Sequence, residues 1–238
     1  MTGTFALAPE EIEAIFLSLK VAATATAAIM PLALATAWLL ARRDFRGKAL
    51  VAGAVHLPLV LPPVVTGYLL LLAFGRQGPA GAFLEETFGI VLAFRWTGAA
   101  LASAVMGFPL AVRAMRLSLE AVDRGLEEAA ASLGAPPWAV FLGVTLPLMA
   151  PGILAGAVLA FAKSLGEFGA TITFVSNIPG ETRTVPAAIY GHLQAPGGDA
   201  AALRLTVVAI VLSLAALVAS ELLARRVSAR LGGGDALA

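Results

Sequence analysis

The sequence predicts an all-α integral membrane protein with five transmembrane helices, forming one domain over residues 1–238 with its core at about 12–224. Hydrophobic residues make up 59% of the 238 residues and charged residues only 13%, against about 25% charged in an ordinary soluble domain. The apolar residues also come in long uncharged blocks, and a membrane-spanning helix needs about 20 of them to cross about 30 Å of hydrocarbon. We therefore expect the bilayer to be the solvent of this chain.

The expected spans follow from the uncharged stretches. Residues 21–41 and 49–75 are each long enough for one span, whereas 96–112 needs its flanking residues to complete one. The stretch 129–162 is too long for one helix, and the Gly and Pro residues within 134–137 divide it into a surface segment and a span. The five expected spans are about 14–41, 49–75, 96–117, 141–163 and 201–224.

The basic residues predict the orientation, because short cytoplasmic loops hold an excess of Lys and Arg. With five spans, segments 42–48, 113–140 and 225–238 lie on the same side of the membrane. Most of the 16 basic residues fall there, namely Arg42, Arg43, Arg46, Lys48, Arg113, Arg116, Arg124, Arg225, Arg226 and Arg230. We therefore expect the N-terminus outside and the C-terminus in the cytoplasm.

Composition argues against several other functions. The formal charge of +1 leaves no excess of positive charge to neutralise the phosphates of a nucleic acid, so a nucleic-acid partner is not expected. With no Cys and two His, we expect no metal site and no catalytic residues. No GxxxxGK[ST] motif appears, so we expect a non-enzymatic chain that binds no nucleotide or other cofactor. Glu10, Glu11 and Glu13 stand where a signal peptide would be basic, so none is expected.

A short amphipathic helix is predicted at 123–134. Asp123 is suited to cap its N-terminus, and Gly134 followed by two prolines ends it. Its apolar residues recur at helical spacing on one face: Leu126, Ala129, Ala130 and Leu133. Such a face either packs on its own chain or lies in a groove of a partner protein.

The spacing around this helix resembles the EAA loop of ATP-binding-cassette (ABC) importer permeases, here 118–140. The match runs through Glu128-Ala129-Ala130, Gly134, Val144, where the family more often has Ile, and Leu146-Pro147. The resemblance implies a type I ABC importer permease fold, with this segment as the coupling helix that docks on a cytoplasmic ATPase. The residues implied in ATPase coupling are Glu127, Glu128, Ala129, Ala130, Leu133, Gly134, Leu146 and Pro147.

A second group of polar residues follows the fourth span. Lys163 and Glu167 are four positions apart and can pair on a helix. Ionisable groups at membrane depth usually face the bundle interior or a water-filled cavity, so a structural pair and a pathway role both stay open. Neutral hydroxyl and amide donors nearby either bond their own backbone or contact a tetrahedral oxyanion. The candidate substrate pathway or gate residues are Lys163, Ser164, Glu167, Thr171, Thr173, Ser176 and Asn177.

This second segment resembles the molybdate importer permeases, the ModB-type subunits. The match covers 164–184, SLGEFGATITFVSNIPGETRT, and extends to 56–65 and 104–110. The resemblance implies a multi-pass permease in the cytoplasmic (inner) membrane of a prokaryote. Its implied partners are a second copy of the chain, two ABC ATPases that use ATP and Mg²⁺, and an external molybdate-binding protein. Tungstate or sulfate remains an alternative substrate.

Prolines within or beside the spans are typical of transporters whose helices bend. Each removes a backbone donor, which is tolerated where neighbours or a cavity satisfy the freed carbonyls. They are Pro31, Pro58, Pro62, Pro63, Pro109, Pro147 and Pro151. A membrane enzyme would instead need clustered carboxylates or histidines at one membrane face. An assembly factor would need neither the EAA spacing nor the 176–184 segment.

Overall fold

The computed structural model describes residues 6–231, and every regular element within that range is a helix. The N-terminal half contains α1 (Pro9–Arg42), α2 (Lys48–Val60), α3 (Pro63–Phe74), α4 (Pro79–Phe88) and α5 (Trp96–Glu120). Next come α6 (Arg124–Ser132), α7 (Pro137–Val140), a π-helical segment (Phe141–Thr145), α8 (Leu146–Leu148) and α9 (Ala150–Leu165). The chain continues through α10 (Gly169–Val175), α11 (Val185–Gln194) and α12 (Asp199–Leu231).

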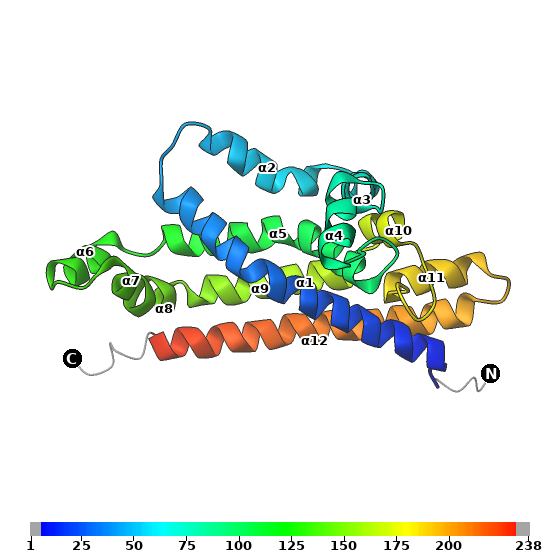
Figure 1. Ribbon diagram of the computed structural model, residues 1–238. Helices are drawn as coiled ribbons and strands as arrows, with labels where there is room; N and C mark the ends of the chain where they lie inside the picture. The colour runs from blue at the N-terminus through cyan, green and yellow to red at the C-terminus, as the bar shows by residue number, and fades with distance from the viewer. Residues whose placement is uncertain (1–5, 232–238) are drawn as a thin grey trace.

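The centre of the fold is a bundle of α1, α5 and α9, with α12 running along α9 (Figure 1). Two groups of buried side chains hold it together. One joins α1 to α5 near the α6 end, through residues such as Leu40, Met115 and Leu119. The other joins α5 to α10 at the opposite end and includes Phe174 and Val175. The bundle therefore has an end that carries α6 and an end that carries α10 and α11.

Small residues let α5 and α9 approach closely. A side chain at Gly152 would collide with Ser118, and one at Gly156 would lie 3.1 Å from the carbonyl oxygen of Ala111. The two glycines are four positions apart on α9, the spacing of close-packed helix pairs in membranes. This contact fixes α9, and with it the residues that follow at its end.

Three helices are long and apolar enough to cross a membrane singly, namely α1, α5 and α12. Two further candidates are bent pairs, α2 with α3 at 113° and the α7–α8 segment with α9 at 65°. The count is therefore three spans, or up to five if each bent pair is one span. All five coincide with the uncharged stretches that the sequence indicates.

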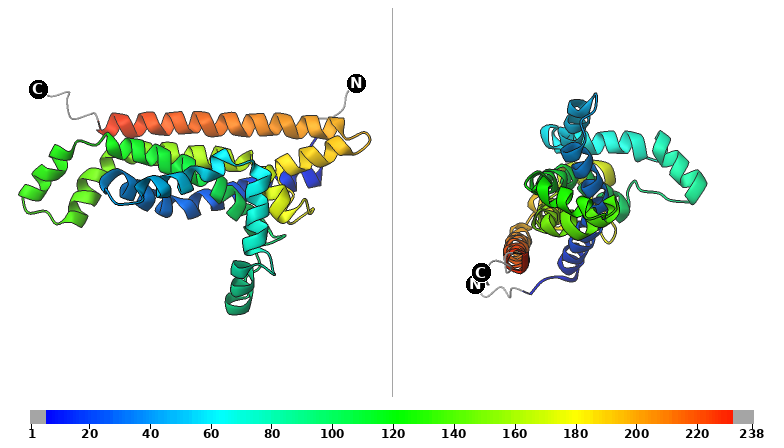
Figure 2. Two further views of the ribbon diagram at one scale, coloured as in Figure 1. Left: turned by 90° about the horizontal axis from the view of Figure 1, so that it is seen from above. Right: turned by 90° about the vertical axis from the view of Figure 1, so that its left-hand side faces the viewer.

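The expected span 49–75 is not one straight helix, because the chain turns sharply at Leu61 and Pro62. The proline rings of Pro62 and Pro63 remove two backbone donors and restrict the residue before each of them. Beyond the bend, α3 and α4 leave the bundle sideways (Figure 2). No sequence pattern indicates α4.

The third span is also longer than expected, since α5 continues to Glu120. Arg113 and Arg116 lie within this helix, as the expected span 96–117 has them, although the charge pattern also counted them with the cytoplasmic segment 113–140. Both are on the part of α5 that α2 flanks.

Candidate functional site

The helix predicted at 123–134 is confirmed as α6. The carboxylate of Asp123 accepts a hydrogen bond from the backbone N–H of Gly125 at 2.8 Å, which caps the first turn. Gly134 follows the helix with φ +87°, a left-handed conformation that favours glycine. Sequence alone therefore located both ends of this element.

The apolar face of α6 is not covered by the described part of this chain. Leu126 is 49% exposed and Leu133 is 89% exposed, while Ala129 is exposed and Ala130 half-buried. Large apolar side chains left open in this way on an otherwise polar helix are typical of a surface that binds a partner protein.

A side of α6 next to this face is tied to the bundle through Glu127. Its Oε1 accepts a hydrogen bond from Nη2 of Arg42, at the end of α1, at 2.9 Å. The same oxygen accepts a hydrogen bond from Oγ1 of Thr145 at 2.6 Å. Thr145 is buried and ends the π-helical segment, a local geometry that is frequent at functional sites. One carboxylate thus connects α6 to α1 and to the segment that leads into α9.

The other residues expected in coupling surround this connection. Glu128 is exposed, and its carbonyl oxygen accepts a hydrogen bond from the Ser132 hydroxyl at 2.9 Å. Leu146 and Pro147 begin α8 directly after the π-helical segment and are half-buried. Their role in coupling to an ATPase stays a prediction.

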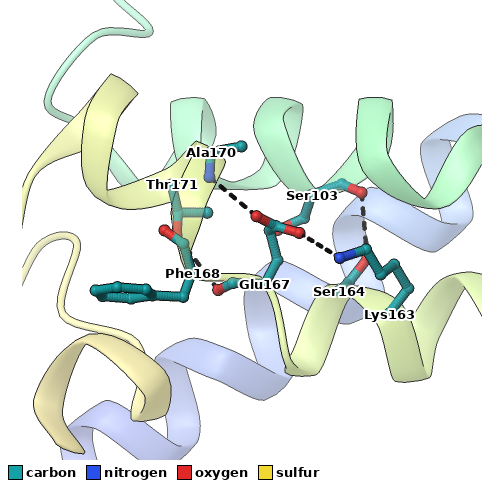
Figure 3. Close-up of polar contacts among 7 residues, drawn as sticks. All are labelled: Ser103, Lys163, Ser164, Glu167, Phe168, Ala170 and Thr171. Atoms are coloured by element: carbon teal, nitrogen blue, oxygen red, sulfur yellow. Dashed lines mark hydrogen bonds and ion pairs between the residues drawn. The ribbon is translucent and has the colours of Figure 1, made fainter. Parts of the chain in front are cut away.

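The second polar group lies where α9 ends and α10 begins (Figure 3). Glu167 is only 2% exposed and accepts hydrogen bonds at both carboxylate oxygens. Nζ of Lys163 donates to Oε2 at 2.7 Å, and the backbone N–H of Ala170 donates to Oε1 at 3.0 Å. The pairing predicted from the spacing is present, but α9 ends at Leu165, so Glu167 lies beyond the helix and not on its face. Glu167 thereby joins the last turn of α9 to the first turn of α10.

The neighbouring hydroxyls bond mainly to backbone. Oγ1 of Thr171 donates to the carbonyl oxygen of Phe168 at 2.9 Å, and that of Thr173 to Gly169 at 2.8 Å. Oγ of Ser164 lies 3.5 Å from the carbonyl oxygen of Ser103 on α5. The two threonine bonds stay within residues 168–173, and the serine contact joins α9 to α5. A pathway role for these side chains stays a prediction.

Ser176 and Asn177 shape the loop after α10. Ser176 has φ +66°, and its carbonyl oxygen accepts a hydrogen bond from Thr182 at 3.2 Å. Asn177 donates to the carbonyl oxygen of Ala187 at 3.2 Å and accepts from Nε of Arg183 at 3.1 Å. Both residues therefore fold the 176–184 segment back onto α11.

Sequence reasoning missed three participants. Arg42 is 85 positions from Glu127 and Thr145 is 18, so no local pattern indicates either contact. The third is Ser103, whose hydroxyl is buried without a hydrogen-bond partner among the described residues and lies close to the Lys163–Glu167 pair. Within the described residues, no three or more His, Asp or Glu side chains gather as metal ligands would.

Comparison with known proteins identifies the family. The ModB molybdenum transport system permease protein of Haemophilus influenzae is 57% identical over 225 residues, which cover 94% of this chain and 98% of that protein. The Escherichia coli K12 protein of the same name is 58% identical over 219 residues, covering 92% and 96%. A solved bacterial ABC transporter involved in the import of the acidic polysaccharide alginate has a similar fold, with a TM-score of 0.72 at 18% identity over 92% of this chain and 80% of that one. Residues 29–229 match the family described as "Binding-protein-dependent transport system inner membrane component", and the chain belongs to that family.

Proposed function

We propose that this chain is the membrane permease subunit of an ATP-driven importer that carries molybdate across the inner membrane. The observation that carries the proposal is the 57–58% identity to two molybdenum transport permeases over nearly the full length of both chains. Import of tungstate or sulfate by the same architecture is the alternative, and these relatives favour molybdate.

The proposed topology has five spans, with the N-terminus outside and the C-terminus in the cytoplasm. Each bent helix pair counts as one span, and the 113° and 65° bends are acceptable where partner helices or a cavity satisfy the freed backbone groups. Support for the orientation comes from Arg42, Arg43 and Arg124, which gather at the α6 end of the bundle.

The proposed partners are two cytoplasmic ABC ATPases, a second copy of this chain and an external binding protein. The exposed apolar face of α6, with Leu126 and Leu133, supports docking of an ATPase. One chain supplies one such helix, and the ATPases of this family work as a pair, so a homodimer supplies two. ATP and Mg²⁺ belong to the ATPases and not to this chain.

The proposed mechanism moves α6 as ATP binding closes the two ATPases. Because Glu127 accepts hydrogen bonds from both Arg42 and Thr145, displacement of α6 pulls on α1 and on the π-helical segment that precedes α9. That motion turns the substrate cavity outward to receive molybdate from the binding protein, and ATP hydrolysis returns it inward.

The coupling part of the proposal is tested by co-purification of the chain with its ATPase. Glu128→Arg and Gly134→Asp should abolish association, since the first reverses a charge on α6 and the second introduces a charge and a strained φ. Asp44→Asn, an exposed change in the loop before α2, is the matched control and should associate normally. Normal association of both α6 variants would show that α6 is not the docking helix.

A further inference from the structure

A cavity of about 450 Å³ lies between α2 and α5 and is lined by basic side chains that no part of the proposed mechanism uses. His56 of α2 faces it together with Arg113, Arg116 and Glu120 of α5. The remaining lining is apolar and includes Leu59 and Leu117. The two helices run beside each other (Figure 1).

The charge in this cavity is not balanced within the described residues. Arg116 is paired with Glu120, whose carboxylate lies 2.7 Å from its Nε. Arg113 is exposed and makes no ion pair or side-chain hydrogen bond with the residues whose side chains the structure describes, 6–219 and 222. One guanidinium is therefore left without an anion, beside an imidazole that can donate a hydrogen bond.

His56 lies within the uncharged stretch 49–75, and Arg113 directly follows the uncharged stretch 96–112. Arg113 is about 10 Å along α5 from its end at Glu120, and His56 is about 12 Å along α2 from its start at Lys48, at a rise of about 1.5 Å per residue. Ionisable side chains at such depth face the interior of an assembly or a water-filled cavity. No residue of α2 is fully buried by the described residues, and His56 is half-buried.

We propose that His56, Arg113 and Arg116 form a binding site for a tetrahedral oxyanion in the half of the protein nearest α6. A guanidinium presents parallel N–H donors that match two oxygens of such an anion, and the imidazole can donate a further hydrogen bond from another direction. The Glu120 carboxylate beside Arg116 limits the positive field, so that binding is weak enough for the anion to leave. The oxyanion is either molybdate on its way to the cytoplasm or the phosphate of a phospholipid.

The inference rests on the proposed function, and the test separates the two. The complex of the permease with its ATPases is purified in maltoside detergent. Equilibrium binding of radiolabelled molybdate to this complex is measured. The phospholipid that stays bound to it is measured separately by mass spectrometry. Wild type is compared with Arg113→Gln, which removes the charge, and Arg113→Lys, which keeps it. The matched control is Arg46→Gln, an exposed loop arginine outside the cavity. Uptake of molybdate and ATP hydrolysis are then measured in vesicles with the binding protein.

We expect Arg113→Gln to weaken molybdate binding about tenfold and slow uptake, because a charge-assisted partner is lost. Arg113→Lys should recover most of both, and Arg46→Gln should match wild type. Loss of bound phospholipid with unchanged molybdate binding would assign the site to a lipid phosphate. If Arg113→Gln changes neither ligand, the site does not exist. Absence of molybdate uptake by the wild type would instead overturn the proposed function.

Discussion

Arg42 and Glu127 stand 85 positions apart, and their side chains meet at 2.9 Å where the end of α1 touches α6. The Arg42 side chain is 12% exposed and that of Glu127 22%, so the pair is largely shielded from water. Thr145 donates to the same oxygen. The helix proposed to dock on the ATPase is therefore held rigidly to two separate elements of the bundle.

Substitution Arg42→Gln tests whether this connection transmits force. Removing the cation leaves a shielded carboxylate with one hydrogen bond, a loss of roughly 1–3 kcal/mol in the attachment of α6. We expect ATP hydrolysis to continue while molybdate uptake falls severalfold, measured as molybdate transported per ATP hydrolysed. Lys48→Gln breaks the exposed pair with Asp44 nearby and should leave this ratio unchanged. An unchanged ratio in Arg42→Gln would contradict the role assigned to the pair.

A second buried ion pair joins the start of α1 to the start of α12. Glu11 is 2% exposed and accepts hydrogen bonds from Nη2 and Nε of Arg204 at 2.8 and 3.2 Å. We expect Arg204→Gln to destabilise the protein in detergent by roughly 3 kcal/mol, because a buried carboxylate loses its counter-ion. Arg76→Gln removes a looser, exposed contact, 3.8 Å from Glu85, and should change stability by less than about 1 kcal/mol. Equal denaturation midpoints for the two variants would contradict this difference.

The Lys163–Glu167 pair is asymmetric, since the Lys163 side chain is 29% exposed and that of Glu167 only 1%. Lys163→Gln leaves a buried carboxylate without a cation, whereas Glu167→Gln leaves a lysine that reaches water and keeps an oxygen for the Ala170 N–H. We therefore expect Lys163→Gln to lower the thermal midpoint more than Glu167→Gln does. The double variant should be more stable than the sum of the single losses predicts, by about 1 kcal/mol or more. Additive losses would show that the two residues are not coupled.

The loop between α1 and α2 offers a prediction about pH. The hydrogen bond from Lys48, and then its charge, hold the pKa of the Asp44 carboxyl below its ordinary value. Because the folded pKa is lower than the unfolded one, the pair contributes stability above about pH 3.9, and this contribution is lost as pH falls through the folded pKa. Lys48→Met should return the pKa of Asp44 towards its ordinary value, as followed by NMR of ¹³C-labelled aspartate. A titration unchanged by the substitution would contradict the contact.

Local patterns account for the parts of the structure that the sequence predicts. Uncharged stretches locate the spans, Asp123 and Gly134 locate the ends of α6, and the four-residue spacing of Lys163 and Glu167 predicts their pair. Contacts between distant segments are different in kind, because no periodicity links Arg42 to Glu127 or Glu11 to Arg204, 193 positions away. The prolines at 62 and 63 predict a break, but the 113° angle and the departure of α4 from the bundle depend on packing.

Uptake into proteoliposomes shows whether this chain carries molybdate. The vesicles contain the chain with its ATPase and receive the binding protein on the outer side, and radiolabelled molybdate and sulfate are offered separately and together. We predict molybdate uptake that requires ATP and the binding protein and is unaffected by equimolar sulfate. Sulfate uptake that molybdate does not compete with would contradict it.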